Sequence, residues 1–455
     1  MIITRSWLEE FIDISKIPTD DICKTLNAIG FEVDSLERIS IAPKVVIGKV
    51  LEKEKHPDAD KLNICQVDLG THQVQIVCGA KNVEAGQFVP VATVGCDLGN
   101  NFVIKEAKLR GVESNGMICS ATELGLPKLN DGILELDDSI GELVLGKELK
   151  EYSKLNDDII EIGLTANRGD CLSINGIVRE LSAFYSIVLI ECDKKINYNK
   201  LGIGQLLEIE CDKHIDSSLS FIVIDFSDFK LNVLQKLRTA IIGKFQENND
   251  VKNILTYTTH TTGVILNAYS KEKTIKGENL NIMYIKKDEL GFDNIYGTEQ
   301  LSKICVEHNE IDTNDTNFII EASYINPELI SKKVFDAKIK TGEVYYKASR
   351  GSEPNIDYGI NYLSTLVSKS GASIYGGCET FVEDKEKLTL DISVNKINAI
   401  IGQEIPKIEI ERILVSLGFV VKDIGSILVI KVPYYRHDIK NIADITEEIV
   451  RIIGI

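Results

Sequence analysis

The sequence predicts a multidomain α+β protein that carries a small antiparallel barrel in its first third. At 455 residues, the chain is too long for one ordinary core, and its length favours roughly three or four domains. After Pro43, five short strand patterns follow one another within about 65 residues, separated by glycine-bearing turns, which is typical of a small barrel. The other segments alternate helix and strand patterns without a repeat, so mixed α/β units are expected around the barrel.

Each element follows from a local pattern. Before the barrel, Pro18 and the acids after it start a helix, with Ile22, Leu26 and Ile29 on one face and Gly30 at its end. The five barrel strands are expected at VVIGKVLE (45–52), LNICQVDL (62–69), VQIVCGA (74–80), FVPVATVG (88–95) and FVIKEAKL (102–109).

The second half contains further helices and strands. A helix is predicted near Ile174–Tyr185, and residues 201–380 alternate strands with helices. Near the C-terminus, helices are expected at Asn395–Ile401 and Ile408–Leu417. Two strands, FVVKD and SILVIKV, and a final helix follow them.

Composition limits the possible functions. The net charge of −18 argues against a general polyanion binder, because phosphate contacts need local Lys and Arg. No run of about 18 apolar residues suggests a membrane span, and charges at Arg5, Glu9 and Glu10 interrupt any signal-peptide core. The ten cysteines are scattered without metal-ligand spacing, which favours reduced, mostly buried thiols. We expect a cytoplasmic protein with no membrane or DNA partner.

The barrel carries the candidate nucleic-acid contacts. A five-stranded barrel offers one strand face and its adjoining loops to an oligonucleotide. Its candidate phosphate ligands are Lys53, Lys55, Lys61, Lys105, Lys108 and Arg110. Residues 39–150 nevertheless contain twelve basic and sixteen acidic residues, a balance of −4. Charge alone therefore favours an ordinary solvated surface over nucleic-acid binding.

Three strings change that interpretation. HPDADKL (56–62), VCGAKN (77–82) and KLRGVESNGMICSATELGL (108–126) resemble the tRNA-binding module shared by several aminoacyl-tRNA synthetases and free tRNA-binding proteins. This module has the OB fold. Taken alone, NRGDCLS (167–173) predicts only a turn with an aspartate cap before a helix. The longer string DIIEIGLTANRGDCLSINGIVRELSAFY (158–185) resembles the segment after that module in the bacterial phenylalanyl-tRNA synthetase beta-subunit family.

The family resemblance implies the domain organisation. A small α/β domain, 1–38 with 151–200, is interrupted by the OB-fold tRNA-binding domain at 39–150. An α/β editing-type (B3/B4) domain is expected at 201–382, and a winged-helix-like B5 domain at 383–455.

The last helix carries an acidic cluster. Asp444, Glu447 and Glu448 are spaced i, i+3 and i+4, so their carboxylates should share one face. Ile442, Ile445, Ile449 and Ile452 make the opposite, buried face. A solvated acidic face near a helix N-terminus is the simpler interpretation. The alternative is a Mg²⁺ site that Asp438 joins, because three like charges repel and Mg²⁺ prefers carboxylates and water.

Resemblance favours the metal. VPYYRHDIKNIADITEEIVRIIG (432–454) resembles the end of the B5 domain, in which two aspartates and a Glu-Glu pair bind Mg²⁺ where beta meets the catalytic alpha subunit. Asp438, Asp444, Glu447 and Glu448 match that spacing.

Residues 201–382 occupy the place of the family's editing domain, which removes tyrosine wrongly attached to the phenylalanine tRNA. A Phe pocket rejects an added hydroxyl poorly, so editing supplements binding. By resemblance, Glu321 recognises the tyrosine hydroxyl and Thr341 also matches the pocket. Asn267 replaces the usual histidine, and residues 303–308 replace a glycine-rich loop that would permit φ > 0. We therefore expect editing to be weak or absent.

The resemblance implies a role in the class II phenylalanine–tRNA ligase. The enzyme would attach phenylalanine to tRNA(Phe) as an α₂β₂ heterotetramer, with the ATP site and aminoacylation catalysis on the alpha subunit. This chain would bind tRNA, carry the editing-type domain and share Mg²⁺ with alpha. The alternatives are a stand-alone tRNA-binding module without a ligase role and a free trans-editing hydrolase.

The family's beta subunit continues past the B5 domain with a catalytic-like domain and an anticodon-binding domain. Neither pattern follows Ile455. We therefore expect this chain to be the N-terminal portion of a longer subunit.

Overall fold

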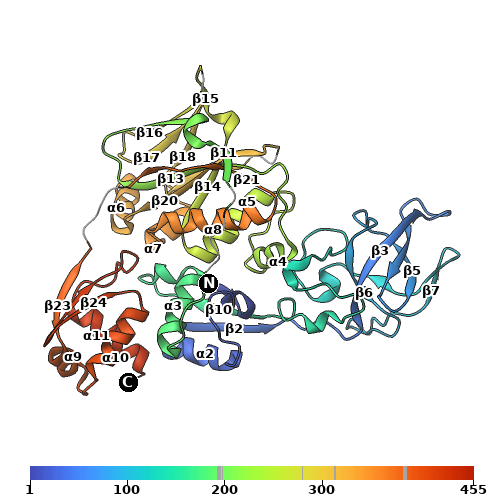
Figure 1. Cartoon of the computed structure of the whole chain (residues 1–455), viewed down its shortest axis with the longest axis horizontal. Coiled ribbons are helices and arrows are strands. Elements are labelled where there is room, and N and C mark those ends of the chain that lie inside the picture. Colours follow the sequence, from blue (N-terminus) through green and yellow to red (C-terminus); the bar gives the residue numbers. More distant parts are fainter. Residues whose placement is uncertain (192–195, 197, 279, 312–313, 383–386, 455) are drawn as a thin grey trace.

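The computed structural model describes residues 1–191, 196, 198–278, 280–311, 314–382 and 387–454. The predicted start of the last domain at residue 383 and the chain end at Ile455 lie outside these ranges. The molecule is elongated: the barrel stands at one end, and the C-terminal module lies at the other end, beside the N-terminal module (Figure 1).

Strands from before and after the barrel form one sheet in the N-terminal module. The antiparallel order is β1 (Ile2–Thr4), β10 (Asp158–Gly163) and β2 (Glu32–Arg38). The helices α1 (Arg5–Leu8), α2 (Thr19–Ala28) and α3 (Ile174–Tyr185) and the 3-10 turn η4 (Gly169–Cys171) complete it. The predicted buried face is confirmed, because Ile22 and Leu26 on α2 and Ile29 directly after it are buried.

The barrel is an antiparallel sheet that nearly closes on itself. Its order is β5 (Gln73–Cys78), β4 (Asn63–Asp68), β3 (Val45–Lys55), β6 (Phe88–Ala92) and β9 (Met117–Ile118). The two edges meet where Asn115 N donates to Gln75 O at 2.9 Å. Three 3-10 turns follow: η1 (Thr122–Leu124), η2 (Asp138–Ile140) and η3 (Leu149–Glu151).

The predicted fifth barrel strand, 102–109, is wrong. Only its end is a strand, β7 (Ala107–Leu109), and β7 pairs with β8 (Val112–Ser114) in a separate hairpin. The cause is the two-residue turn Arg110–Gly111, where φ is 47° and 91°. Positive φ at both central positions is the signature of a type I′ turn, which folds the chain back at once. The fifth strand of the sheet is β9 instead.

The third module is a sandwich of two sheets. The first has the order β11 (Tyr198–Gly202), β21 (Ser373–Gly376), β13 (Ser217–Asp225), β20 (Asn317–Ile325), β14 (Ile265–Ser270), with β22 (Glu379–Phe381) on β13. The second has the order β12 (Leu207–Cys211), β16 (Asn281–Lys287), β17 (Asp293–Tyr296), β18 (Gln300–Lys303), β19 (Glu307–His308), with β15 (Ile275–Lys276) on β16.

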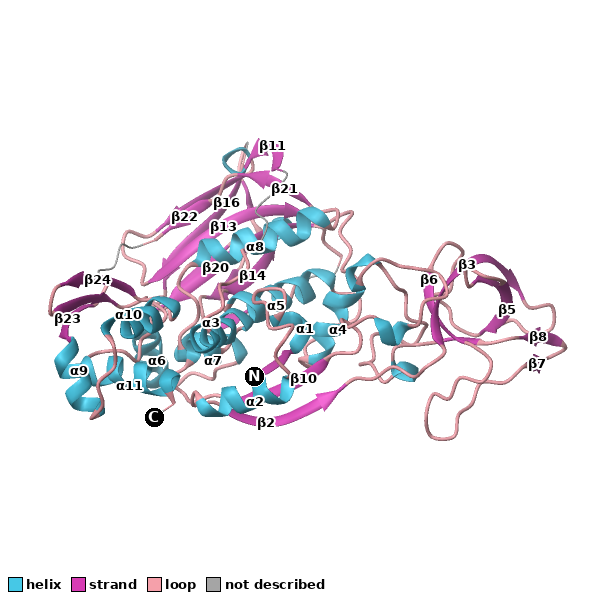
Figure 2. Cartoon of the chain, turned by 60° about the horizontal axis from the view of Figure 1, so that its bottom comes forward, coloured by secondary structure: helices cyan, strands magenta, loops and turns pink. Residues whose placement is uncertain are grey.

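Helices cover the outer face of the first sheet, as Figure 2 shows for α5 and α8. The helices of this module are α4 (Val233–Ile241), α5 (Asp250–Thr262), α6 (Pro327–Ala337), α7 (Glu343–Arg350) and α8 (Ile356–Lys369). Its 3-10 turns are η5 (Ile203–Gln205) and η6 (Lys271–Lys273). Because strand side chains alternate, Phe221 faces the second sheet while Ile222 faces the helices.

The C-terminal module agrees with the predicted order of elements. It consists of β23 (Thr389–Ser393), α9 (Val394–Ile401), α10 (Lys407–Ser416), β24 (Val420–Ile424), β25 (Ile427–Lys431) and α11 (Ile442–Ile453). The antiparallel sheet order is β23-β25-β24. Ile445, Ile449 and Ile452 are buried on α11, as their spacing predicts, whereas Ile442 is only half-buried.

One continuous apolar core joins three modules. This core contains Trp7 on α1, Ile177 on α3, Leu363 on α8 and Ile449 on α11. The barrel stays outside this core and packs its own residues against Val233 of α4. The N-terminal module is therefore the hub on which the sandwich and the C-terminal module rest.

Two expectations about composition can be compared with the structure. Nine free cysteines lie in the described part of the chain and six of them are buried, in line with the predicted buried thiols. Among the described residues, no helix combines the length and the apolar character needed to cross a membrane.

Replacing Gly169 by alanine should loosen the hub. A Cβ at Gly169 would lie 1.9 Å from the backbone oxygen of Arg350, so the N-terminal module and α7 would have to move apart. We expect the free energy of unfolding to fall by about 1–3 kcal/mol, measured by urea titration of the fluorescence of Trp7, the single tryptophan. Gly204→Ala is the control, because nothing lies within 4 Å of its added Cβ. Equal stability of the two variants would contradict this packing.

Candidate functional site

The β7–β8 hairpin is attached to the loop that follows β3. Arg110 Nη1 donates to the backbone oxygen of Asp58 at 3.1 Å, and His56 Nε2 lies 3.1 Å from Leu109 O. Two of the motif strings, 56–62 and 108–126, therefore meet in space although about 50 residues separate them. They form one continuous surface at the tip of the barrel.

His56 holds this surface together. Its ring is buried, and its Nδ1 accepts a hydrogen bond from Asp58 N at 3.1 Å. Because Nδ1 accepts, the proton of the neutral ring lies on Nε2, which then donates to Leu109 O. One imidazole thus folds its own loop and anchors the hairpin, because one ring nitrogen accepts while the other donates.

Five of the six predicted tRNA-contacting cations are exposed: Lys55, Lys61, Lys105, Lys108 and Arg110. The sixth, Lys53, is partly buried and pairs with Glu84 at 2.6 Å. The attached hairpin brings the backbone that carries Lys108 and Arg110 to the loop that carries Lys61, next to Lys55 at the end of β3. Acidic residues share this surface, because Asp58 and Asp60 lie in the same loop and Glu113 is the register partner of Lys108. Charge alone therefore does not single it out, and recognition of a polyanion would depend on individual cations such as Lys61 and Lys108.

A chain of seven charged side chains of alternating sign joins the N-terminal module to the C-terminal module. In order, its members are Asp170, Arg168, Glu180, Arg451, Glu448, Arg436 and Asp438. Each side chain is at most 12% exposed. We call this set the charge chain.

Both ends of the charge chain are forked pairs. Arg168 donates from Nε and Nη2 to the two oxygens of Asp170, each at 3.0 Å. Arg436 donates to Asp438 in the same way, at 2.9 and 2.7 Å. Bidentate pairs of this kind fix geometry as well as charge, so the two ends cannot slide.

Glu180 is the joint between the modules. It lies on α3 and accepts hydrogen bonds from Arg168 of its own module and from Arg451 of α11. Arg451 in turn bonds Glu448, and Arg436 Nη1 reaches Glu448 at 2.6 Å. Every charge in the middle of the chain therefore has partners on two sides, which is the condition for burying charge at tolerable cost.

The arginines keep the buried carboxylates ionised. Burial raises the pKa of Glu448, but the hydrogen bond and charge of Arg436 overcome this and lower the pKa to about 2. Its contribution to stability is complete above the unfolded pKa of about 4.3. It is lost as pH falls through the folded value of about 2.

The four predicted magnesium ligands have separate environments. Asp438 and Glu448 lie in the charge chain. Asp444 caps α11, because its Oδ2 accepts from Lys440 N at 2.7 Å and Asn441 N at 3.0 Å. Glu447 is exposed, whereas its neighbour Glu448 is buried. Mutual repulsion of the three acids of α11 is relieved in different ways: arginines bond Glu448, backbone N–H groups bond Asp444, and Glu447 is exposed to solvent.

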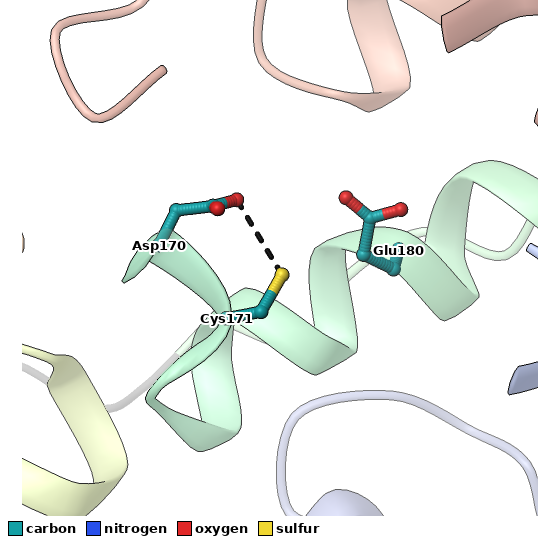
Figure 3. Close-up of side chains that lie close together, drawn as sticks. All are labelled: Asp170, Cys171 and Glu180. Carbon is teal, nitrogen blue, oxygen red and sulfur yellow. Dashed lines mark hydrogen bonds between the residues drawn. The ribbon is translucent and has the colours of Figure 1, made fainter. Parts of the chain in front are cut away.

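In the described residues, the grouping of three metal-ligand atoms within 4.8 Å is Asp170, Cys171 and Glu180 (Figure 3). Arg168 occupies its centre: Nη2 lies 3.0 Å from Cys171 Sγ and also bonds both acids. Burial raises the pKa of the Cys171 thiol, so it lacks the thiolate that a metal needs. The predicted aspartate cap is also wrong, because Ser173 Oγ accepts from Gly176 N and caps α3, while Asp170 is held by Arg168.

Two of the three predicted pocket residues come together. Asn267 on β14 is the register partner of Glu321 on β20, and both are buried between the sheets. Thr341 is exposed in the loop before α7. The hydroxyl of Tyr269 donates to Glu321 Oε2.

The segment 303–308 contradicts one expectation. A segment without glycine is expected to avoid positive φ, yet Cys305 has φ = 58°. This residue turns the chain from β18 to β19 and is fully buried. The packing of its side chain in the sandwich core offsets the conformational cost.

Family models match both ends of the chain. Residues 45–142 match a tRNA binding domain, which contains the barrel sheet and the β7–β8 hairpin. Residues 390–455 match the tRNA synthetase B5 domain, which contains α11 and its acids.

Relatives match the whole chain. It is 44% identical to the phenylalanine–tRNA ligase beta subunit of Sulfurimonas denitrificans, and the match spans 100% of this chain and 59% of that protein. The identity to the corresponding subunit of Wolinella succinogenes is 45%, over 100% and 60%. The chain belongs to the phenylalanine–tRNA ligase beta-subunit family. It spans about three fifths of the length of these curated relatives.

Among solved structures, an N-terminal fragment of the phenylalanyl-tRNA synthetase beta subunit from Pyrococcus horikoshii covers 66% of this chain and 88% of the fragment. The TM-score is 0.34 and the identity 13%, so this likeness adds nothing to the family assignment.

The family resemblance implies a Mg²⁺ ion at Asp438, Asp444, Glu447 and Glu448. Whether these acids could hold the ion depends on which of their oxygens are free. Mg²⁺ needs free carboxylate oxygens in near-octahedral positions. Both oxygens of Asp438 are bonded to Arg436, and both oxygens of Glu448 are bonded to arginines. As arranged in this chain, the four acids do not fit the ion.

Sequence reasoning missed several residues of this beta-subunit chain that organise the sites. They are His56, Arg168, Glu180, Tyr269, Arg436 and Arg451. The arginines offered a signal, because Arg168 stands within NRGDC and Arg436 two residues before Asp438. Tyr269 offered none, since its contact with Glu321 depends on strand register.

Magnesium should not stabilise this chain by itself. With Arg436 already holding Asp438 and Glu448, the thermal midpoint is expected to be the same in excess Mg²⁺ and in chelator. If the chain bound Mg²⁺ specifically, a free Mg²⁺ concentration of about 100 times the Kd would raise the free energy of unfolding by about 2.7 kcal/mol. Calorimetry of the wild-type chain and Glu447→Ala makes the comparison. A midpoint that rises with Mg²⁺ in the wild type and not in the variant would contradict the fit argument.

Proposed function

We propose that this chain is the tRNA-contacting and scaffolding part of a phenylalanine–tRNA ligase beta subunit. Its partner is the alpha subunit, which carries the ATP site and catalyses aminoacylation. The proposed holoenzyme is a class II synthetase with α₂β₂ composition that works in the cytoplasm on tRNA(Phe). The match of the whole chain to ligase beta subunits supports this over a stand-alone tRNA-binding module.

The observation that carries the proposal is the surface formed by the β7–β8 hairpin and the loop after β3. It carries the exposed side chains of Lys61, Lys108 and Arg110, with Lys55 at the adjoining end of β3, within the region that matches a tRNA-binding domain. The barrel sheet also lies at one end of the molecule (Figure 1). A long polyanion could therefore contact this end without meeting the other acidic modules.

The finer domain identities are part of the same proposal. We assign an OB fold to residues 39–150, a B3/B4 editing-type domain to 201–382 and a winged-helix-like B5 domain to 383–455. Residues 1–38 and 151–200 form the small domain between them, and the pairing of β10 with both β1 and β2 supports that grouping.

Magnesium binding and editing would each require side chains of this chain to rearrange. A Mg²⁺ shared by Asp438, Asp444, Glu447 and Glu448 would require Arg436 to release its partners in the complex with alpha, and no step of the proposal depends on this ion. Editing at Glu321, Asn267 and Thr341 would need the exposed Thr341 to join two buried residues.

Removing the hairpin cations should flatten the salt dependence of tRNA binding. For Lys108→Gln with Arg110→Gln, the slope of log K against log salt is expected to shrink by about 0.7 to 0.9 for each phosphate group that the variant no longer binds. Fluorescence anisotropy with labelled tRNA(Phe) across a salt series measures it.

Lys53→Gln is the matched control. Because Lys53 is already paired with Glu84, this substitution should change the slope less. An unchanged slope in the hairpin variant would place the tRNA contacts elsewhere. A slope changed equally by Lys53→Gln would show a diffuse charge effect instead of a site.

A further inference from the structure

A buried polar cluster lies between the two sheets of the sandwich module. Asn267 and Glu321 are register partners, and Tyr269 lies diagonal to Glu321 on the same face. Ser302 reaches the cluster from the second sheet, where its Oγ lies 2.7 Å from the Tyr269 hydroxyl. All four side chains are at most 3% exposed, so solvent does not reach them.

Glu321 uses a tyrosine hydroxyl as its hydrogen-bond donor. Tyr269 donates to Oε2, while Oε1 and Asn267 Nδ2 are buried without a hydrogen-bond partner in the described part of the chain. Burial raises the pKa of Glu321, which favours a neutral carboxyl group. A buried acid that offers one oxygen to a hydroxyl, with unpaired polar atoms beside it, is a built recognition site.

The surroundings of the cluster suit one chemical group. Tyr269 belongs to an apolar core that also contains Phe221, Ile295 and Leu301. An apolar slot that ends in a hydrogen-bonding carboxyl is complementary to a phenol, whose ring is apolar and whose hydroxyl is a donor.

We propose that Tyr269 is an internal ligand of this site: the Glu321 cluster binds the phenol group of its own chain and is thereby closed to a tyrosine from outside. Only the identity of the outside ligand rests on the proposed function. Since Glu321 has no exposed surface, an outside tyrosine could contact it only after Tyr269 leaves and the sheets part.

Cavity rescue tests the inference in the full chain. Tyr269→Ala removes the internal phenol and should lower the thermal midpoint, and p-cresol should restore it by filling the space. Toluene lacks the hydroxyl, so it should need a concentration at least about tenfold higher for the same rise. Equal effects of the two compounds, or no effect of either, would overturn the proposal.

The double variant Tyr269→Ala with Glu321→Met is the matched control. It has the same space without the carboxyl group, so the preference for p-cresol over toluene should disappear. A preference that persists would mean that Glu321 does not read the hydroxyl, and the proposal would fall.

A second measurement decides the case if Tyr269→Ala does not fold. Tyr269→Phe removes the donor to Glu321, and Glu321→Met removes the acceptor of Tyr269, whose hydroxyl then keeps Ser302. The double variant removes both groups of the Tyr269–Glu321 pair, so the second change costs less than it does alone. We expect both single variants to melt below the wild type and the double variant to melt above the less stable single variant. Strictly additive losses would overturn the proposal.

The outcome is independent of the proposed ligase role. The rescue and the double variant report on the sandwich core, while tRNA affinity and its salt dependence report on the barrel surface. If the inference about Tyr269 fails, the proposed tRNA-binding role is unaffected, and the reverse is also true.

Discussion

The ion pair between Glu180 on α3 and Arg451 on α11 is the contact on which the arrangement of the modules depends. These residues are separated by 271 positions in sequence, and through them the N-terminal and C-terminal modules share one buried charge chain. A buried charge left without any partner costs about 3–5 kcal/mol. Loss of Arg451 should cost less, because Glu180 keeps Arg168 and Glu448 keeps Arg436. The apolar core would hold the modules together without direction, whereas the forked arginines fix their relative position.

The same logic recurs at two sites where the family resemblance implies an outside ligand. At Asp438 and Glu448, the positive charge comes from Arg436. At Glu321, the phenol comes from Tyr269. In both places a group of the chain itself satisfies buried carboxyl groups that would otherwise be costly. Internal partners of this kind stabilise the fold and at the same time compete with any outside ligand.

Local sequence patterns predicted most helices and strands. The partners of the site residues depend on contacts between segments that are far apart in sequence. The isoleucine spacing of α11 and the helix at Ile174–Tyr185 are visible in sequence because helical periodicity is local. The fifth barrel strand was misplaced because the type I′ turn at Arg110–Gly111 folds the end of the segment 102–109 back onto β8. The acids of α11 were found, but their arginine partners were not, since Glu448 meets Arg436 through tertiary folding. Tyr269 and Glu321 meet only once the strand register is known.

The most direct test of this account is a double-mutant cycle across the joint, with Glu180→Gln, Arg451→Met and the pair of changes. Trp7 lies in the N-terminal module and is buried, so the urea unfolding of its fluorescence reports on a module that does not contain Arg451. The account predicts that Arg451→Met lowers this midpoint and that the two residues are coupled by at least about 1 kcal/mol. A Trp7 transition unaffected by Arg451→Met, or effects additive within about 0.5 kcal/mol, would show that the charge chain does not hold the modules together.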